Sequence, residues 1–76
     1  MMEIKQRIKS VISRTFKLDQ VPDDVSQDNC ENWDSLRHLN LVVDLEQEFD
    51  ISIEPEEIAV MKSFQDIVKI VNDKLI

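Results

Sequence analysis

The chain has 76 residues, no glycine and a formal net charge of −7, divided into +4 over residues 1–17 and −11 over residues 18–76. A chain this short is expected to form one domain over residues 1–76, with too small a core for a deep, walled active site. The absence of glycine excludes glycine-dependent phosphate loops, and the acidic balance argues against nucleic acid and favours proteins with basic patches as partners.

The first predicted element is an amphipathic helix from about Glu3 to Phe16. Its apolar residues recur at helical spacing on one stripe: Ile4, Ile8, Val11, Ile12 and Phe16. The periodicity then disappears over residues 17–33, where turn-forming side chains predict a long loop. We expect three apolar residues to pin this loop to the core: Leu18, Val21 and Val25.

A second helix is predicted to begin near Ser35 and to end near Phe49 or Asp50. It carries more apolar residues than one core-facing stripe requires. The residues in excess are Leu36, Leu39, Val42 and Val43. Some of them are expected to contact a ligand or a partner, and the alternative is that all four belong to the core.

The segment after the second helix is predicted to be a linker and a short helix. Residues 51–53 alternate as a strand does, but a lone three-residue strand has nothing to pair with, so we expect an extended linker. Pro55 suits the first turn of a helix. That helix is expected to end at Val60 or Met61.

The last helix is predicted to span about Phe64 to Lys74. Ser63 is placed to cap it, with Asp66 as the reciprocating acid of a capping box. Together the elements predict an all-α fold, a small bundle of three principal helices plus one short helix, with a long loop between the first two.

Asp34, Ser35 and His38 lie within five residues and raise the question of a hydrolase. A catalytic triad needs a separate carboxylate, an oxyanion hole and a substrate cleft, and this glycine-free chain offers no evident source for them. His38 is expected to be a helix-surface residue. One histidine and one cysteine do not form a zinc site, and the loop acids do not match a calcium loop, so no metal is expected.

Cys30 is the single cysteine and cannot form an internal disulfide, so it is expected to be a semi-buried loop residue. No signal peptide or membrane-spanning apolar run is present in the sequence. We therefore expect a cytoplasmic, monomeric protein that is not bound to a membrane.

Ser35 has two interpretations. It is either the N-cap of the second helix, which is a local backbone role, or the attachment point of a phosphodiester, which the positive end of the helix dipole would favour. Local reasoning alone does not choose between these interpretations.

Four stretches together resemble the acyl carrier and peptidyl carrier protein family over essentially the whole chain. The first is Asp34-Ser35-Leu36, which resembles the family's Asp-Ser-Leu motif. The others are the later part of the second helix with the start of the linker (residues 41–51), the short-helix stretch (residues 53–58) and the start of the last helix (residues 63–67). Their order and spacing agree with that family. Trp33 before the motif places the chain among Trp-Asp-Ser-Leu types.

The resemblance implies a carrier and not an enzyme, with phosphopantetheine covalently attached to Ser35 and Asp34 and Leu36 flanking the attachment site. The implied partners are a phosphopantetheinyl transferase, an acyl- or aminoacyl-loading ligase, and downstream transferases or synthases. The resemblance also implies a docking surface on the second and short helices. Its implied members are Asp34, Asp44, Glu46, Glu48, Glu56 and Glu57, around Leu36, Val43 and Met61.

The chain departs from the carriers of fatty-acid synthesis at several positions. Asn32 replaces a common glycine, and Arg37, Asn40 and Gln47 stand where those carriers often have acids. The resemblance therefore implies a specialised pathway, which makes a fatty acid, a polyketide, a nonribosomal peptide or a saccharide substituent. The alternative function is an unmodified helical interaction module in which Ser35 is only an N-cap.

Overall fold

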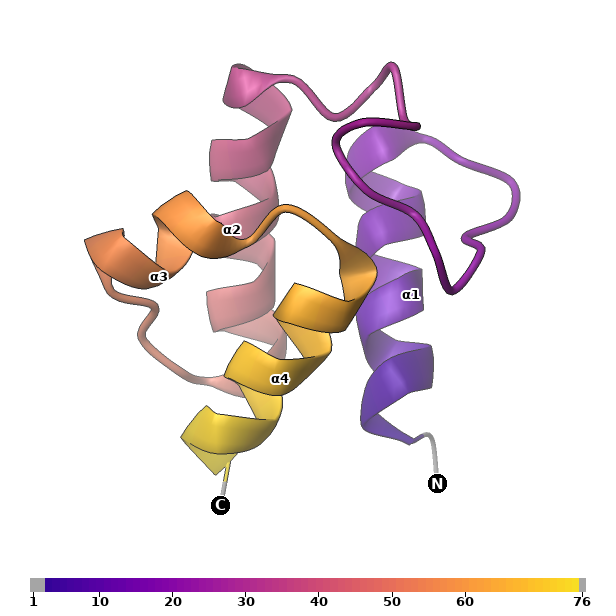
Figure 1. Ribbon diagram of the computed structural model, residues 1–76. Coiled ribbons are helices and arrows are strands. Elements are labelled where there is room, and N and C mark those ends of the chain that lie inside the picture. Colours follow the sequence, from indigo (N-terminus) through magenta and orange to yellow (C-terminus); the bar gives the residue numbers. More distant parts are fainter. Residues whose placement is uncertain (1–2, 76) are drawn as a thin grey trace.

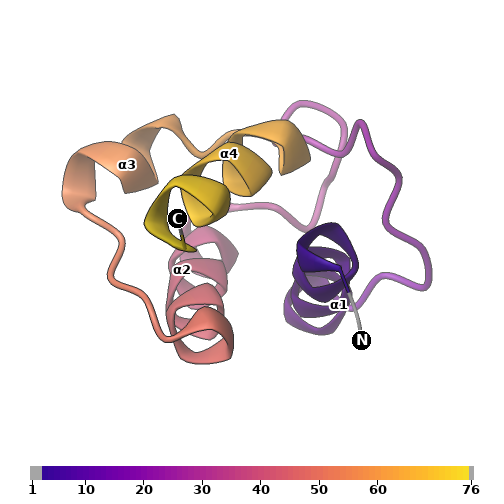
Figure 2. The same cartoon turned by 90° about the horizontal axis from the view of Figure 1, so that it is seen from below.

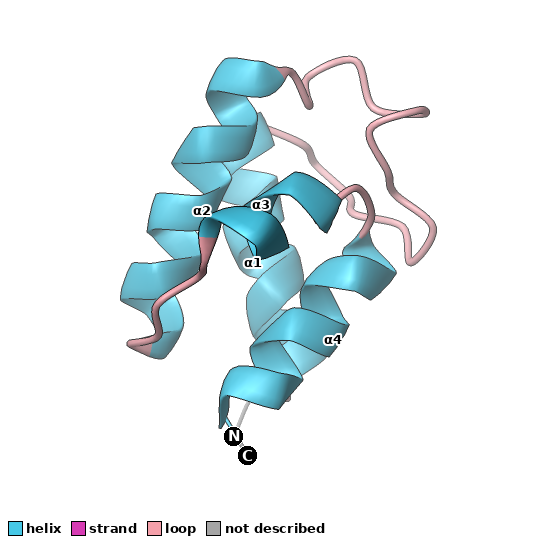
Figure 3. Ribbon diagram, turned by 60° about the vertical axis from the view of Figure 1, so that its left-hand side comes forward, coloured by secondary structure: helices cyan, strands magenta, loops and turns pink. Residues whose placement is uncertain are grey.

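The structure is a computed structural model that describes residues 3–75. Both limits predicted for the domain, residues 1 and 76, therefore lie outside the described residues. Its helices, in chain order, are α1 (Ile4–Phe16), α2 (Ser35–Phe49), α3 (Pro55–Val60) and α4 (Phe64–Leu75) (Figure 1). Figure 3 shows only helices and loops over the described residues. The predicted all-α architecture is confirmed.

The first two helices lie side by side and run in opposite directions (Figure 1). α1 packs against α2 and also against α4, which crosses the pair, whereas α3 lies at the outer side of α2 (Figure 2). The long loop connects the end of α1 to the start of α2. As a result, the start of α2 lies at the opposite end of the molecule from the start of α1 and the end of α4.

The core is formed by apolar side chains from all three long helices, and the described residues contribute no buried polar or charged side chain to it. Its fully buried large members are Phe16, Phe64, Ile8, Ile12, Leu41, Leu45, Met61, Ile67, Val11 and Val71. The stripe predicted for α1 is confirmed at four of its positions, because Ile4 is only partly buried while the others are in the core.

The long loop is fixed to the rest of the protein at several points. Val25 is buried, and Leu18 and Val21 pack against the core, as predicted. The Phe64 N–H donates to the Val25 carbonyl at 2.9 Å, and the Gln27 N–H donates to the carbonyl that precedes Ser63 at 2.9 Å. These bonds join the middle of the loop to the start of α4.

Two helices end in a left-handed residue without using glycine. Lys17 (φ 57°) follows α1 and Asp50 (φ 55°) follows α2, and each backbone N–H bonds back into its helix. This conformation is the common way to satisfy the last carbonyls of a helix. A glycine-free chain therefore adopts it at residues that carry a side chain, at some cost in backbone energy.

The caps of the last two helices follow the sequence closely. Glu54 and Glu57 form a capping box around Pro55 at the start of α3. Ser63 Oγ accepts the Asp66 N–H at 3.2 Å, as predicted, but the Asp66 carboxylate accepts from the Lys62 N–H at 3.2 Å. The expected reciprocal bond from Asp66 to Ser63 is thus replaced by one to the preceding residue.

Candidate functional site

Ser35 is the first residue of α2, and its side chain is exposed. Asp34 is the N-cap: its backbone is extended (φ −97°, ψ −179°), and its Oδ1 accepts the Arg37 N–H at 2.8 Å. The interpretation of Ser35 as the N-cap is therefore wrong. Because Ser35 already has a helical backbone and Asp34 does the capping, the Ser35 hydroxyl is not committed to the helix start.

The start of α2 favours an anion. The first N–H groups of a helix have no acceptor within it, and the helix dipole places positive charge there. Arg37 adds a cation on the same turn, where its Nη1 lies 2.9 Å from Asp34 Oδ2. Apart from this cap, the first turn of α2 contains no acid. A phosphate on Ser35 would meet backbone donors and a nearby guanidinium.

A chain of hydrogen bonds runs behind Ser35 from the loop to α3. Trp33 Nε1–H donates to His38 Nδ1 at 2.9 Å, and His38 Nε2 lies 2.9 Å from the Ile58 carbonyl oxygen. An indole N–H is only a donor, so Nδ1 must be the acceptor and Nε2 must carry the proton that binds Ile58. Trp33 is 5% exposed and also packs on Phe16, with 5.2 Å between ring centroids.

This chain of hydrogen bonds corrects the expectation for His38. The side chain is half-buried between the loop and α3 and is not a free surface residue. Both of its ring nitrogens are bonded to groups other than Ser35. Since a general base must reach the proton of its nucleophile, the geometry does not support a Ser35–His38 hydrolase. The sequence does place a tryptophan five residues before this histidine, but that spacing alone does not predict a hydrogen bond between them.

Ser35 lines an open depression of about 450 Å³ at the junction of the loop and α2. Its other lining residues are Gln27, Trp33, Asp34, His38 and Leu39. Gln27 comes from the distant part of the loop that is bonded to the start of α4, and nothing in the sequence pattern predicted it beside Ser35. Ser35 therefore has an adjoining surface with aromatic, aliphatic and amide groups.

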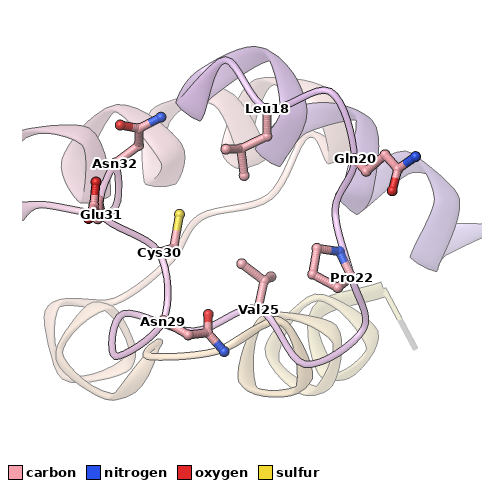
Figure 4. A pocket seen from close by; sticks show the side chains of 8 residues that line it. All are labelled: Leu18, Gln20, Pro22, Val25, Asn29, Cys30, Glu31 and Asn32. Atoms are coloured by element: carbon pink, nitrogen blue, oxygen red, sulfur yellow. The ribbon is translucent and has the colours of Figure 1, made fainter.

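A second depression, of about 370 Å³, lies under the long loop and is separate from Ser35 (Figure 4). Leu18, Val25 and Cys30 extend toward its middle, while Asn32 lies at its edge. Cys30 is half-buried, as predicted. Ser35 is absent from the residues that line this depression, which therefore adds no group to the site at α2.

Two acids of α2 that the resemblance assigns to partner docking are held by contacts within the chain. Asp44 Oδ2 accepts the Thr15 hydroxyl at 2.6 Å, which joins α2 to α1. Glu46 Oε2 accepts the Ile53 N–H at 2.9 Å, which fixes the linker after α2. Both acids are half-buried, so changing either one would also disturb packing between elements.

Glu48 is the third of these acids on α2 and faces α1. It pairs with Arg7 at 3.0 Å and with Arg14 at 3.5 Å. Arg7 also donates to the Glu48 backbone carbonyl at 2.7 Å and lies over the ring of Phe49. The bases that give the N-terminal segment its positive charge thus neutralise part of α2.

The acids of α3 differ in their availability. Glu57 pairs with Lys74 of α4 at 2.6 Å. The hydrogen bond from Lys74, followed by the backbone bond from Glu54, lowers the pKa of Glu57, and the same pairing raises the pKa of Lys74. Glu56 is exposed. Of the two acids, Glu56 is therefore the one free to meet a partner directly.

The apolar residues of the expected docking surface separate into two groups. Leu36 and Val43 are 71% and 49% exposed, and Leu39 is 55% exposed on the same side of α2. Val42 is in the core, but because the other three are exposed, the alternative in which all four apolar residues belong to the core is wrong. Met61 is fully buried, because the chain turns inward after α3, and it is not available as a surface contact.

No helix over residues 3–75 is long and apolar enough to cross a membrane. The same residues contain no group of three or more side chains arranged to hold a metal ion.

Comparison with known proteins identifies the class of the fold first. The structure resembles the holo acyl carrier protein of Geobacter metallireducens, with a TM-score of 0.86 and 28% identity, covering 97% of this chain and 87% of that one. It also resembles the acyl carrier protein of Thermotoga maritima, with a TM-score of 0.71 and 26% identity over 96% of this chain and 95% of that one. The helical arrangement is that of an acyl carrier protein.

The sequence comparison then establishes the family. The chain is 31% identical to the acyl carrier protein of Thermosynechococcus vestitus over 75 residues, which cover 96% of this chain and 93% of the relative. It is also 31% identical to the acyl carrier protein of Petrotoga mobilis over 75 residues, with 96% and 88% coverage. No family model matches the chain. The chain belongs to the acyl carrier protein family, whose members are in general carrier proteins and not enzymes.

Proposed function

We propose that this protein carries acyl or aminoacyl intermediates as thioesters on a phosphopantetheine arm attached to Ser35, and that residues 1–76 act as one carrier domain. The observation that carries the proposal is the exposed hydroxyl of Ser35 at the first position of α2, left free because Asp34 caps the helix. The arm, when attached, supplies the thiol that holds the cargo.

The residues at the start of α2 fit such an arm. The Ser35 oxygen would take the phosphopantetheinyl group of coenzyme A and lose its proton, while adenosine 3′,5′-bisphosphate leaves. The resulting phosphodiester would lie at the positive end of α2, where Arg37 is also present. Leu36 is exposed beside it and would remain available to the modifying enzyme.

The test is intact-mass measurement after incubation with coenzyme A and phosphopantetheinyl transferases that modify a control carrier. The wild-type protein should gain one phosphopantetheine, and Ser35→Ala should gain none. His38→Asn, which alters the histidine of the hydrolase alternative, should still be modified. If the wild-type protein stays unmodified, the unmodified interaction module becomes the better account of the fold.

We further propose that the transferase, a loading ligase and downstream transferases or synthases dock on α2 and α3. Exposed Leu36, Val43 and Glu56 support a contact surface there. Asp44, Glu46, Glu48 and Glu57 would act at its margins, since each is also held within the chain. A protein of this charge also suits association with basic partners in the cytoplasm.

The exposed side of α2 supports a specialised pathway over bulk fatty-acid synthesis. Asn40 and Gln47 are exposed there and uncharged. The cation of Arg37 is paired with Asp34. A partner that selects carriers by an acidic α2 would find fewer free acids on this one. The test is to compare how fast ligases that load different classes of cargo act on this carrier and on a carrier of fatty-acid synthesis. A specialised pathway predicts that the two carriers are preferred by different ligases.

A further inference from the structure

Two of the residues that line the depression beside Ser35 have their side-chain nitrogens already bonded. The Trp33 indole N–H and His38 Nδ1 bond to each other at 2.9 Å. His38 Nε2 is bonded to the Ile58 carbonyl. Because these three nitrogens already have partners, they do not compete for ligand hydrogen bonds, and Trp33 and His38 contribute mainly carbon surface to the depression.

The walls of the depression offer the two kinds of contact that a mixed ligand needs. Leu39 is 55% exposed and could bury more aliphatic surface. Gln27 also lines the depression, is exposed, and carries an amide that both donates and accepts hydrogen bonds. A chain that begins at Ser35 and bears methyl groups followed by amides is chemically complementary to these walls.

The other route from Ser35, toward α3, is bridged by His38. Its bond to the Ile58 carbonyl joins α2 to α3 one turn below the attachment serine. A group entering between these helices at this point would have to break that bond and leave the part-buried His38 Nε2–H without its acceptor. Leaving a part-buried donor unpaired is costly, so the depression on the loop side is the more accessible surface.

Resting on the proposed function, we propose that the depression lined by Gln27, Trp33, His38 and Leu39 is a seat for the first segment of the phosphopantetheine arm. The geminal methyl groups of the arm pack mainly on exposed Leu39, next to the part of Trp33 that lines the depression, and the first amide of the arm bonds to the Gln27 side chain. The arm in the resting carrier lies against the loop side of α2 and does not pass between α2 and α3.

The test uses NMR of the holo protein, with the same holo protein in denaturant as the reference for a free arm. Protons close to a tryptophan ring are shifted by its ring current, so the geminal methyl resonances of the folded holo protein should differ from those in denaturant. Cross-peaks from these methyls to Leu39 and Trp33, and a shift of the Gln27 side-chain amide on loading, are the expected results.

Exposed residues supply variants that should leave the fold intact. Leu39→Ala and Gln27→Ala should each return the methyl resonances toward the denatured reference. Leu75→Ala, which removes the same atoms at an exposed α4 residue outside the depression, is the matched control and should leave the methyl resonances unchanged. Circular dichroism would establish that all three variants are folded.

The inference is overturned if the geminal methyls of the folded holo protein resonate where they do in denaturant, or if their cross-peaks run to Ile58 or Val43. In either case the mass of the holo protein still shows that Ser35 carries the arm, so the proposed function stands. Failure of the proposed function would instead show as an unmodified mass, before any NMR measurement.

Discussion

The assignment of the α2 cap to Asp34 predicts that two adjacent substitutions will have unequal effects on stability. Asp34→Ala removes the carboxylate that accepts the Arg37 N–H at 2.8 Å. Loss of an N-cap typically costs about 1 kcal/mol, within a range of roughly 0.5–2 kcal/mol. Ser35→Ala removes a hydroxyl that does not cap the helix, so its effect should stay within about 0.5 kcal/mol.

The cap can be separated from the ion pair with a third variant. Asp34 also pairs with Arg37 through its other oxygen, but both side chains are about half exposed, 51% and 44%. Exposed pairs of this kind contribute only about 0.2–1 kcal/mol. Asp34→Asn keeps a capping oxygen and loses the charge, and asparagine caps helices about as well as aspartate. Its stability should therefore lie much closer to wild type than that of Asp34→Ala.

Urea unfolding followed by far-ultraviolet circular dichroism measures these differences, and thermal unfolding gives an independent check. For a domain of this size, 1 kcal/mol corresponds to a shift in Tm of roughly 4–8 °C. The reasoning is refuted if Ser35→Ala loses as much stability as Asp34→Ala, because the serine would then be the cap. Equal losses in Asp34→Asn and Asp34→Ala would show that the ion pair, and not the cap, matters.

The contacts around the site and core give three more predictions. His38→Ala should lower the free energy of unfolding by about 1–3 kcal/mol, because it leaves the buried N–H of Trp33 unpaired. Urea unfolding measures this loss, and an unchanged midpoint would contradict the Trp33–His38 hydrogen bond. Lys74→Met should flatten the pH dependence of stability, because it removes the partner that shifts both pKa values. The stability that comes from the lowered Glu57 pKa is present above the ordinary value of 4.5 and is lost as pH falls through the lowered pKa. The stability that comes from the raised Lys74 pKa is present below the ordinary value of 10.5 and is lost as pH rises through the raised pKa. Thermal unfolding across pH would test this, and identical profiles for variant and wild type would refute it. Ile12→Ala should cost about 2–5 kcal/mol at a fully buried position and leave much of this small domain unfolded by circular dichroism, whereas full native signal with an unchanged Tm would show that the core tolerates the cavity.

Local patterns in the sequence determined the helices of this protein. The stripe that includes Ile8, Val11 and Phe16 predicted α1, and the boundaries predicted for the helices agree with the structure to within one residue. Pro55 and Ser63 marked the starts of the last two helices because a fixed φ and a capping hydroxyl act on neighbouring residues only. The motif around Ser35 likewise pointed to the family.

Contacts between elements decided the remaining features. The family resemblance assigned Met61 and Val43 to the same docking surface, and only the path of the chain after α3 placed Met61 in the core while Val43 stayed exposed. His38 was equally ambiguous, because the Trp33 N–H and the Ile58 carbonyl that bind it come from different elements. Periodicity reports which face of a helix a residue occupies, whereas the partner on that face depends on how helices and loops pack together. The sequence by itself therefore determined the helices and the candidate attachment serine, and the tertiary structure decided which side chains surround that serine.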